Sequence, residues 1–412
     1  MKNTIINFII FIIFGKRGKR MEFSRKLQQL PDQFFAALVQ KVNAALSEGR
    51  DIINLGQGNP DQPTPQHIIA ALQQAAENPQ THKYSPFRGI EELRIAAADF
   101  YKRTYNVDID PQTEVAILGG TKIGLVELPM ALLNEGDVML LPDPGYPDYL
   151  SGVVLAGAEM KTMPLTADND FLPDYTQLDA DTLEQVKLMY LNYPNNPTGA
   201  TATLKFFEET VALAKKHNIA VSHDFAYGAI GFDGKRPVSF LQAEGAKDVG
   251  VEMYTLSKSF NMAGWRIGFA VGNKDIIAAI NLIQDHLFCS IFPAIQHAGV
   301  AALTQELHEL DELSDMYERR RNVLVEEAHR IGWNIKAPTG SFFAWLRVPK
   351  GYTSAQFADA LLDKCDVAVA SGNGFGEYGE GYVRVGLLVS EERLREFIAR
   401  VEAKNLLHAA VK

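Results

Sequence analysis

The stretch TLSKSFNMAGWRIG, residues 255 to 268, is the most informative part of this chain, because it places one lysine among hydroxyls and an arginine at short spacings. The amine of Lys258 can condense with an aldehyde and hold an aldehyde cofactor as a Schiff base. Arg266 and the hydroxyls of Thr255 and Ser257 suit the phosphate of such a cofactor. The same residue types are common in a solvated surface turn, so the interpretation depends on whether other parts of the chain agree.

Two further stretches follow apolar runs that predict buried strands. In NYPNNPTG, residues 192 to 199, Asn196 is a candidate binding residue, although Asn and Pro also form plain turns for local reasons. In IAVSHDFAYG, residues 219 to 228, Asp224 ends the run and Tyr227 follows three positions later. A buried carboxylate favours the protonated form of a ring nitrogen beside it. Asp224 could instead cap a helix, and His223 is expected to be a packed histidine.

A third stretch, ILGGTKIGLVEL at residues 117 to 128, reads as a strand, a glycine-rich turn and the start of a helix. Free N–H groups and the helix dipole at such a turn both attract an anion, so it can bind a phosphate. It would serve equally as a tight connection between strand and helix. Downstream, PDPGYPDY brings Tyr146 into the same region, where it is either a site residue or a packed loop tyrosine.

A fourth stretch, YVRVGLL at residues 382 to 388, interrupts an alternating strand pattern with Arg384. An arginine is costly to bury without a partner, and its planar fork binds a carboxylate through two parallel hydrogen bonds. The pattern therefore favours a carboxylate site at Arg384, with an edge-strand arginine that faces water as the alternative.

In this order the motifs resemble those of the class I/II aminotransferases. Their separations are also close to the family's: 224 − 196 = 28, 258 − 224 = 34 and 384 − 258 = 126 residues. The resemblance covers the chain from about residue 21 to its end. It implies the cofactor pyridoxal 5′-phosphate and fold type I of the pyridoxal-phosphate enzymes, an α/β fold with a large domain and a smaller α+β domain. The large domain would hold a mostly parallel seven-stranded sheet between helices.

The same resemblance implies a role for each candidate residue. Lys258 anchors the cofactor and acts as the general base, Asp224 keeps the pyridine nitrogen protonated, and Tyr146 stacks on the pyridine face. Tyr227 and Asn196 donate to the phenolic oxygen. The implied phosphate-binding residues are Gly120, Thr121, Lys122, Thr255, Ser257 and Arg266, together with Tyr84, which reaches the phosphate in the neighbouring subunit of a homodimer. The implied substrate-binding residues are Arg384 and Asn196, with Gly56 and Gln57 of INLGQGNPD as the opposite wall.

Apolar runs alternate with amphipathic helical patterns, which predicts a mostly parallel sheet covered on both faces. The predicted strands include VAILGG, DVMLLPD, KLMYLNY, AVSHD and GFAVG. They put the glycine turn, Asn196, Asp224 and Lys258 at or beyond strand ends, where open α/β sheets bind ligands. From about residue 276 we expect one long helix through Arg330, then short strands. The expected divisions are an N-terminal segment (21–55) that joins the small domain, a large domain (56–285) and a small domain (286–412).

Composition agrees with a soluble cytoplasmic enzyme. The chain has 412 residues, of which 47% are hydrophobic, enough for two domains with sizeable cores. Its formal charge of −10 does not support attraction to nucleic acid or to an anionic membrane. The two cysteines, Cys289 and Cys365, have no metal-binding spacing and suit a reducing cytosol as packed residues.

Residues 1 to 20 differ from the rest, with the apolar run INFIIFIIF followed by KRGKR. The run is too short to span a bilayer, and basic residues stand where a secretory signal would have its small-residue cleavage site. We expect an upstream extension outside the fold, beginning from a misassigned start codon, with a membrane anchor as the alternative.

Substrate identity follows only from closer resemblance. Runs such as TLSKSFNMAGWRIGFAVGN and GNGFGEYGEGYVRVGLL resemble the Bacillus-type aminotransferases of methionine salvage, which make methionine from 4-methylthio-2-oxobutyrate. The aromatic side chains that could line a site for the substrate side chain, or simply pack in the core, are Phe342, Phe343, Phe375 and Tyr378. The rival functions are an aminotransferase of aromatic, kynurenine or diaminopimelate substrates, a pyridoxal-phosphate C–S lyase, and a ligand sensor. A sensor normally carries a DNA-binding domain that twenty mostly apolar residues cannot form.

Overall fold

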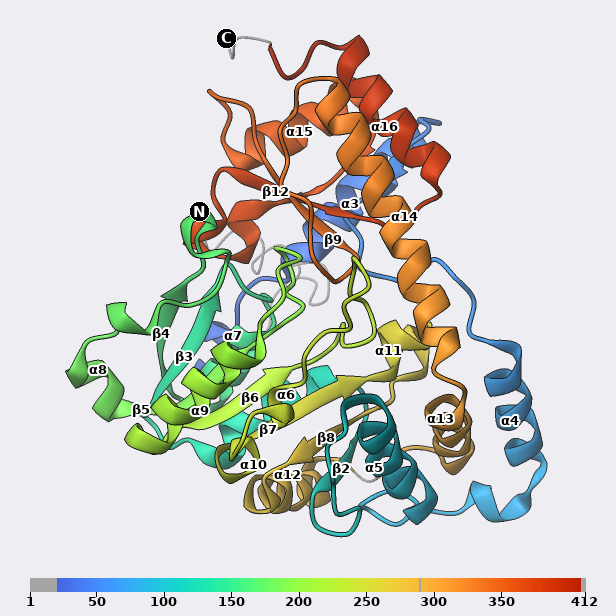
Figure 1. The fold of residues 1–412 in the computed structure, drawn as a ribbon, viewed down its shortest axis with the longest axis vertical. Helices are drawn as coiled ribbons and strands as arrows, with labels where there is room; N and C mark the ends of the chain where they lie inside the picture. Colours follow the sequence, from blue (N-terminus) through green and yellow to red (C-terminus); the bar gives the residue numbers. More distant parts are fainter. Residues whose placement is uncertain (1–20, 289, 409–412) are drawn as a thin grey trace.

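The larger part of the molecule is built on a seven-stranded sheet with the strand order β2-β8-β7-β6-β5-β3-β4 (Figure 1). The computed structural model describes residues 21–288 and 290–408. Strand β8 runs antiparallel to both β2 and β7, and the other neighbouring pairs are parallel. The strands are β2 (Val115–Leu118), β3 (Val138–Asp143), β4 (Glu159–Pro164), β5 (Val186–Leu191), β6 (Ala220–Asp224), β7 (Gly250–Thr255) and β8 (Gly268–Gly272). The predicted mostly parallel sheet is thus confirmed.

Helices cover both faces of this sheet, because successive strand residues point to opposite sides and both sides are apolar. One face packs against α6 (Thr121–Leu132), α7 (Tyr149–Ala156) and α12 (Lys274–Leu287). The other packs against α5 (Glu91–Tyr105), α9 (Leu204–His217) and α13 (Pro293–Thr304), and α4 (Gln66–Glu77) lies against α13. Short helices α8 (Ala180–Gln185), α10 (Ala246–Val249) and α11 (Leu256–Ser259) connect the strands.

A second apolar core is formed by the C-terminal part of the chain, at the top of Figure 1. It contains the antiparallel sheet β11-β12-β9 and the three helices packed on it. Its elements are α14 (His308–Arg330), β9 (Phe343–Arg347), α15 (Ser354–Cys365), β10 (Val367–Ala368), β11 (Ala370–Ser371), β12 (Tyr382–Gly386) and α16 (Glu391–Ala403).

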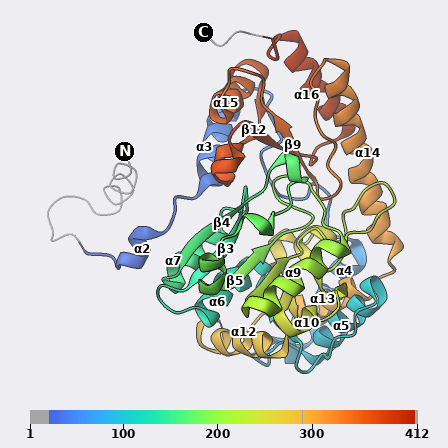
Figure 2. The same ribbon diagram turned by 60° about the vertical axis from the view of Figure 1, so that its left-hand side comes forward.

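The N-terminal segment lies beside this second core. Strand β1 (Ile53–Asn54) pairs in parallel with β10, and α3 (Phe34–Ser47) packs near it, whereas α2 (Arg25–Gln29) contacts α7 (Figure 2). The domain limits given above stay a prediction.

The structure corrects one expectation. The single long helix from residue 276 to Arg330 is three helices, α12, α13 and α14. The first break precedes Pro293, which occupies the first turn of α13, where a proline without an N–H is tolerated.

The remaining expectations concern the first twenty residues, the two cysteines and possible membrane-spanning helices. The expectations for residues 1–20 and for Cys289 lie outside the described part of the chain. Cys365 is buried, as predicted. Within residues 21–288 and 290–408, no helix is both long and apolar enough to cross a membrane.

Candidate active site

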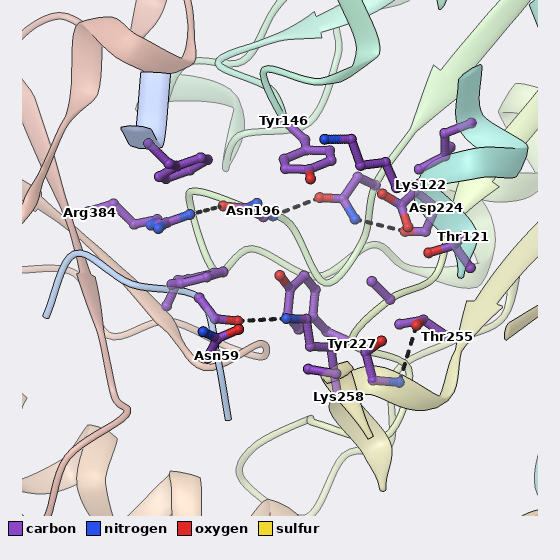
Figure 3. Close-up of a pocket in the computed structure, with 18 of the residues that line it drawn as sticks. Asn59, Thr121, Lys122, Tyr146, Asn196, Asp224, Tyr227, Thr255, Lys258 and Arg384 are labelled. Carbon is purple, nitrogen blue, oxygen red and sulfur yellow. Dashed lines mark hydrogen bonds between the residues drawn. The ribbon is translucent and has the colours of Figure 1, made fainter. Parts of the chain in front are cut away.

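A cavity of about 310 Å³ lies where the carboxyl ends of the parallel strands face the C-terminal core (Figure 3). Strands β2, β5, β6 and β7 run in the same direction, so the residues that follow them meet at one edge of the sheet. Eleven of the predicted site residues line the cavity. They are Thr121, Lys122, Tyr146, Asn196, Asp224, Tyr227, Thr255, Ser257, Lys258 and Arg266, joined by the predicted substrate residue Arg384.

Lys258 lies on the short helix α11, just after β7. Thr255 caps this helix by accepting a hydrogen bond from the N–H of Ser257, which fixes the turn that carries the lysine. The Lys258 ammonium donates to the carbonyl of Gly58 at 2.6 Å. Burial, together with the positive charges of Arg384 and Arg266, lowers the pKa of Lys258 to about 8. The lysine is therefore much closer to its reactive neutral form at physiological pH than an ordinary lysine.

Asp224 is the last residue of β6, and it is buried. Its Oδ2 accepts a hydrogen bond from the Tyr149 hydroxyl at 2.7 Å. Its Oδ1 is buried and has no hydrogen-bond partner in the described part of the chain. Burial raises the pKa of Asp224 to about 6, against the opposing effect of the Tyr149 hydrogen bond. A buried carboxylate oxygen without a partner is costly, so this oxygen is suited to a positively charged N–H group of a ligand.

The anion-binding side of the cavity is built by α6 and Arg266. Gly120 caps α6 with φ +88°, and a Cβ on it would lie 2.3 Å from Nη2 of Arg266. This left-handed conformation favours glycine at this position. Arg266 itself has φ 54°, and its guanidinium donates to the carbonyl of Ala263 at 2.8 Å. The free N–H groups at the start of α6 and the arginine together form a site for a phosphate.

Lys122 shares this side of the cavity but forms an ion pair with Asp148 at 2.7 Å. Its ammonium is therefore already paired, although its backbone N–H belongs to the first turn of α6.

Arg384 is only 1% exposed and lies on the middle strand of its sheet, so the alternative of a water-facing edge arginine is wrong. Its Nη1 donates to Oδ1 of Asn196 at 2.8 Å and its Nη2 to the carbonyl of Gly56 at 2.9 Å. Among residues 21–288 and 290–408, no acidic side chain forms an ion pair with Arg384, and burial lowers its pKa to about 10. A buried arginine held in place without an anion is prepared for a carboxylate from outside.

Three aromatic rings surround this guanidinium. Its carbon lies 3.9 Å from the ring centre of Phe343, 4.9 Å from that of Phe375 and 5.1 Å from that of Phe35. Such cation–π contacts compensate part of the lost hydration of a buried arginine. Of the four aromatic residues considered from the sequence, Phe343 lines the cavity, Phe342 is fully buried behind it, and Tyr378 is 45% exposed.

The loop of residues 192 to 199 is both a turn and part of the site. Asn192 donates from its side-chain amide to the carbonyl of Asp224 at 2.7 Å, and its Oδ1 accepts the N–H of Asn196 at 2.7 Å. Asn196 is thereby fixed beside Arg384, as Figure 3 shows. Tyr146 and Tyr227 lie across the cavity from each other, and burial raises the pKa of both hydroxyls.

The positions of three residues, Gly56, Gln57 and Tyr84, differ from what the sequence predicts for them. Gly56 contributes its carbonyl to Arg384, whereas Gln57 does not line the cavity, where Gly58 and Asn59 stand instead. Tyr84 is 90% exposed and lies outside the cavity, beside Phe292.

Sequence reasoning missed several residues that the structure brings to the site. Tyr149 holds Asp224, and it stands in the same PDPGYPDY stretch as Tyr146, so a tyrosine at the end of that turn was the available signal. Tyr149 does not line the cavity itself; the unpredicted residues that line it are Phe35, Gly58, Asn59, Leu125, Asn192, Ala226 and Ala263. Phe35 lies outside all of the motifs and carried no signal in its own helix.

Comparison with known proteins places this site in a family. The model of the family described as aminotransferase class I and II matches residues 50–401. The chain is 62% identical over 387 residues to the L-glutamine--4-(methylsulfanyl)-2-oxobutanoate aminotransferase of Bacillus subtilis (strain 168), which covers 94% of this chain and 97% of that protein. It is 49% identical over 382 residues to transaminase BacF of the same organism, covering 92% and 96%. The solved substrate-bound BacF structure from Bacillus subtilis has a TM-score of 0.90 at 47% identity, covering 95% of this chain and 100% of that chain.

Proposed function

The chain belongs to the class I and II aminotransferases, and we propose that it transfers an amino group to 4-methylthio-2-oxobutyrate, which yields methionine. The protein is a pyridoxal-phosphate-dependent enzyme that moves an amino group between an L-amino acid and a 2-oxo acid. The single observation that carries the substrate is the 62% identity, over nearly the full length of both chains, to a relative named for L-glutamine and this 2-oxo acid. We propose L-glutamine as the donor on the same ground.

The residues of the cavity fit pyridoxal phosphate. The partnerless Oδ1 of Asp224 suits a protonated ring nitrogen, and the turn at Gly120 with Arg266 suits the phosphate. The buried amine of Lys258 suits the aldehyde. When bound, the cofactor supplies an aldehyde that condenses with amines and a protonated ring that accepts electron density from the substrate α-carbon.

The chain's own groups would then act in sequence. Arg384, with Asn196 beside it, binds the α-carboxylate and so fixes the α-carbon in the cavity. Lys258, as a neutral amine, takes the proton from that α-carbon and later returns it. Asp224, held by Tyr149, stays ionised opposite the ring nitrogen. The aromatic rings around Arg384 exclude water from the carboxylate.

An acceptor panel tests this proposal. Purified protein with cofactor and L-glutamine would be given 4-methylthio-2-oxobutyrate, phenylpyruvate, the 2-oxo acid of kynurenine and the diaminopimelate precursor, and the amino acid formed would be quantified. The proposal expects the highest kcat/KM with 4-methylthio-2-oxobutyrate. A higher value with another acceptor would keep the aminotransferase and reassign its substrate. Release of pyruvate and ammonia from a thioether amino acid without an acceptor would indicate a lyase.

Cofactor loading should depend on pH through Lys258. An amine with a pKa of about 8 is about 10% neutral at pH 7, whereas an ordinary lysine is about 0.04% neutral. Because only the neutral amine attacks the aldehyde, the rate at which cofactor-free protein gains visible absorbance should rise with pH and reach half its maximum near pH 8. Stopped-flow absorbance between pH 6 and 10 measures this. A half-maximum above pH 10 would show that the cavity does not perturb the lysine.

Phe35 should influence the choice of acceptor. It lies next to Arg384 in the cavity, so the side chain of a bound substrate passes close to its ring, and thioether sulfur packs favourably on aromatic rings. Replacing Phe35 with alanine should raise KM for 4-methylthio-2-oxobutyrate about 10-fold, which is typical of a lost hydrophobic wall. KM for 2-oxoglutarate should change less. Leu46→Ala, an exposed change on the same helix, is the matched control. Equal effects of Phe35→Ala on both acceptors would remove Phe35 from the side-chain pocket.

We further propose a homodimer in the cytoplasm, with Tyr84 reaching the phosphate in the neighbouring subunit, and the domain division given above. Supporting the dimer, an open hollow on the molecular surface is lined by apolar side chains of Ile123, Val126, Met130 and Phe292, and Tyr84 is exposed near Phe292. Analytical ultracentrifugation tests the assembly, and a monomer at micromolar concentration would overturn it. Tyr84→Phe should weaken cofactor binding if the tyrosine reaches the phosphate.

A further inference from the structure

His223 and Glu252 form a fully buried pair beneath the active site. They are register partners on the parallel strands β6 and β7, and His223 Nδ1 lies 2.8 Å from Oε2 of Glu252. Glu252 also accepts hydrogen bonds from the Tyr101 hydroxyl, the Ser239 hydroxyl and the N–H of Phe240, at 2.7 to 2.8 Å. Because both Glu252 oxygens act as acceptors, the network assigns a hydrogen to Nδ1 of His223.

The other ring nitrogen of His223 holds the active-site loop. Nε2 lies 3.1 Å from the N–H nitrogen of Tyr193 and 2.9 Å from the Tyr193 carbonyl. A neutral imidazole accepts from the N–H, and a charged one donates to the carbonyl, so His223 contacts this residue's backbone in either state. Tyr193 belongs to the loop of residues 192 to 199, which joins the end of β5 to Asn196.

The same loop leads directly to the two groups that hold the substrate and the cofactor. Asn192, the neighbour of Tyr193, bonds both the carbonyl of Asp224 and the N–H of Asn196, and Asn196 accepts from Arg384. His223 also immediately precedes Asp224 on β6. A positive charge on His223 would lower the pKa of Asp224 and so oppose the larger effect of burial.

We propose that the His223–Glu252 pair positions the Asn196 loop and the end of β6 for transamination, an inference that rests on the proposed function. Neither side chain lines the cavity, so both are positioning residues. The titratable group that contacts His223 is Glu252 from β7, which also accepts from Tyr101 of α5, and Asp224 is the next residue on the same strand. The rings packed around it are Phe207 from α9, Phe225 and Phe240. A merely structural pair would stabilise the core without affecting the loop.

Three variants test the inference. His223→Phe fits the aromatic surroundings but removes both polar contacts, and Glu252→Gln keeps the shape but removes the acceptor that sets the tautomer. His223→Gln replaces the first variant if it does not fold. Thr81→Val is the control, because Thr81 is also buried and loses hydrogen bonds to the carbonyls of Ala75 and Asn78 at the end of α4.

Three readouts are required. Hydrogen exchange of the cofactor-free protein should show faster exchange of the amides of residues 192 to 199 in both pair variants and not in the control. Cofactor-loaded pair variants should lose about 10- to 100-fold in kcat/KM, as expected for a small misplacement of catalytic groups. The pH midpoint of their visible absorbance should also shift from that of the wild-type protein.

The inference is overturned if loop exchange is unchanged, or if exchange changes while kcat, KM and the absorbance midpoint stay as in the wild-type protein. If the wild-type protein performs no transamination, the proposed function fails, whereas the exchange result still reports on the loop by itself. The two failures are therefore distinguishable.

Discussion

A Lys258→Ala protein should lose the visible absorbance of the lysine-bound cofactor and at least about 10⁴-fold of its turnover, because one group supplies both the anchoring amine and the general base. Lys258 is held in the cavity by the Gly58 carbonyl, and the other lining lysine, Lys122, is paired with Asp148. No second unpaired lysine therefore lines the cavity in the described part of the chain to replace it. Absorbance spectra and single-turnover assays measure both effects.

Two controls sharpen that result. Lys161→Ala removes an exposed lysine on the edge strand β4 and should leave spectrum and turnover unchanged. A small added amine such as methylamine should restore part of the turnover of Lys258→Ala, because it can replace the missing base. Retained visible absorbance and retained turnover in Lys258→Ala would remove Lys258 from both roles.

Arg384→Lys should lower kcat/KM for the amino donor about 10²-fold, equal to about 3 kcal/mol of lost binding. Lysine keeps the positive charge but lacks the planar fork that Asn196 and Gly56 hold in place. The loss should lie mainly in KM, since the carboxylate is bound both before and during the reaction. Steady-state kinetics with the donor varied measures this.

The matched control is Arg393→Lys, in which the arginine forms surface ion pairs with Asp51 and Glu396. It should leave KM unchanged. If Arg384→Lys binds the donor as well as the wild-type protein does, the substrate carboxylate is bound elsewhere.

Much of the candidate site could be predicted because its polar residues follow apolar runs directly. Asp224 ends β6, Lys258 follows β7 and Gly120 follows β2, so strand direction alone gathers them at one edge of the sheet. Tyr149 and Phe35 could not be assigned in this way. Tyr149 reaches Asp224 from the first turn of α7, and Phe35 reaches Arg384 from α3. Such contacts depend on how helices pack, which no local pattern records.

The fold was predictable to a similar extent. Four of the five strands predicted for the large sheet have continuous apolar runs, and β6 begins within a short one at residues 219 to 221. In contrast, β4 is an exposed edge strand with polar residues. Strand β7 was not predicted, because it contains Glu252 and a charged residue argues against a buried strand. The structure shows that β7 is fully buried and that Glu252 is paired with His223. The predicted long helix is interrupted before Pro293, where α13 begins, and again between α13 and α14.

The most direct test of the account measures amino transfer and its dependence on one residue. Cofactor-loaded wild-type protein and Lys258→Ala would each be incubated with the proposed donor and acceptor, and the amino acid formed, donor consumed and ammonia released would be quantified together. The account predicts that the wild-type protein forms one amino acid for each donor consumed, without release of ammonia, and that the variant forms almost none. Ammonia and a 2-oxo acid released without any acceptor, or equal product from both proteins, would contradict it.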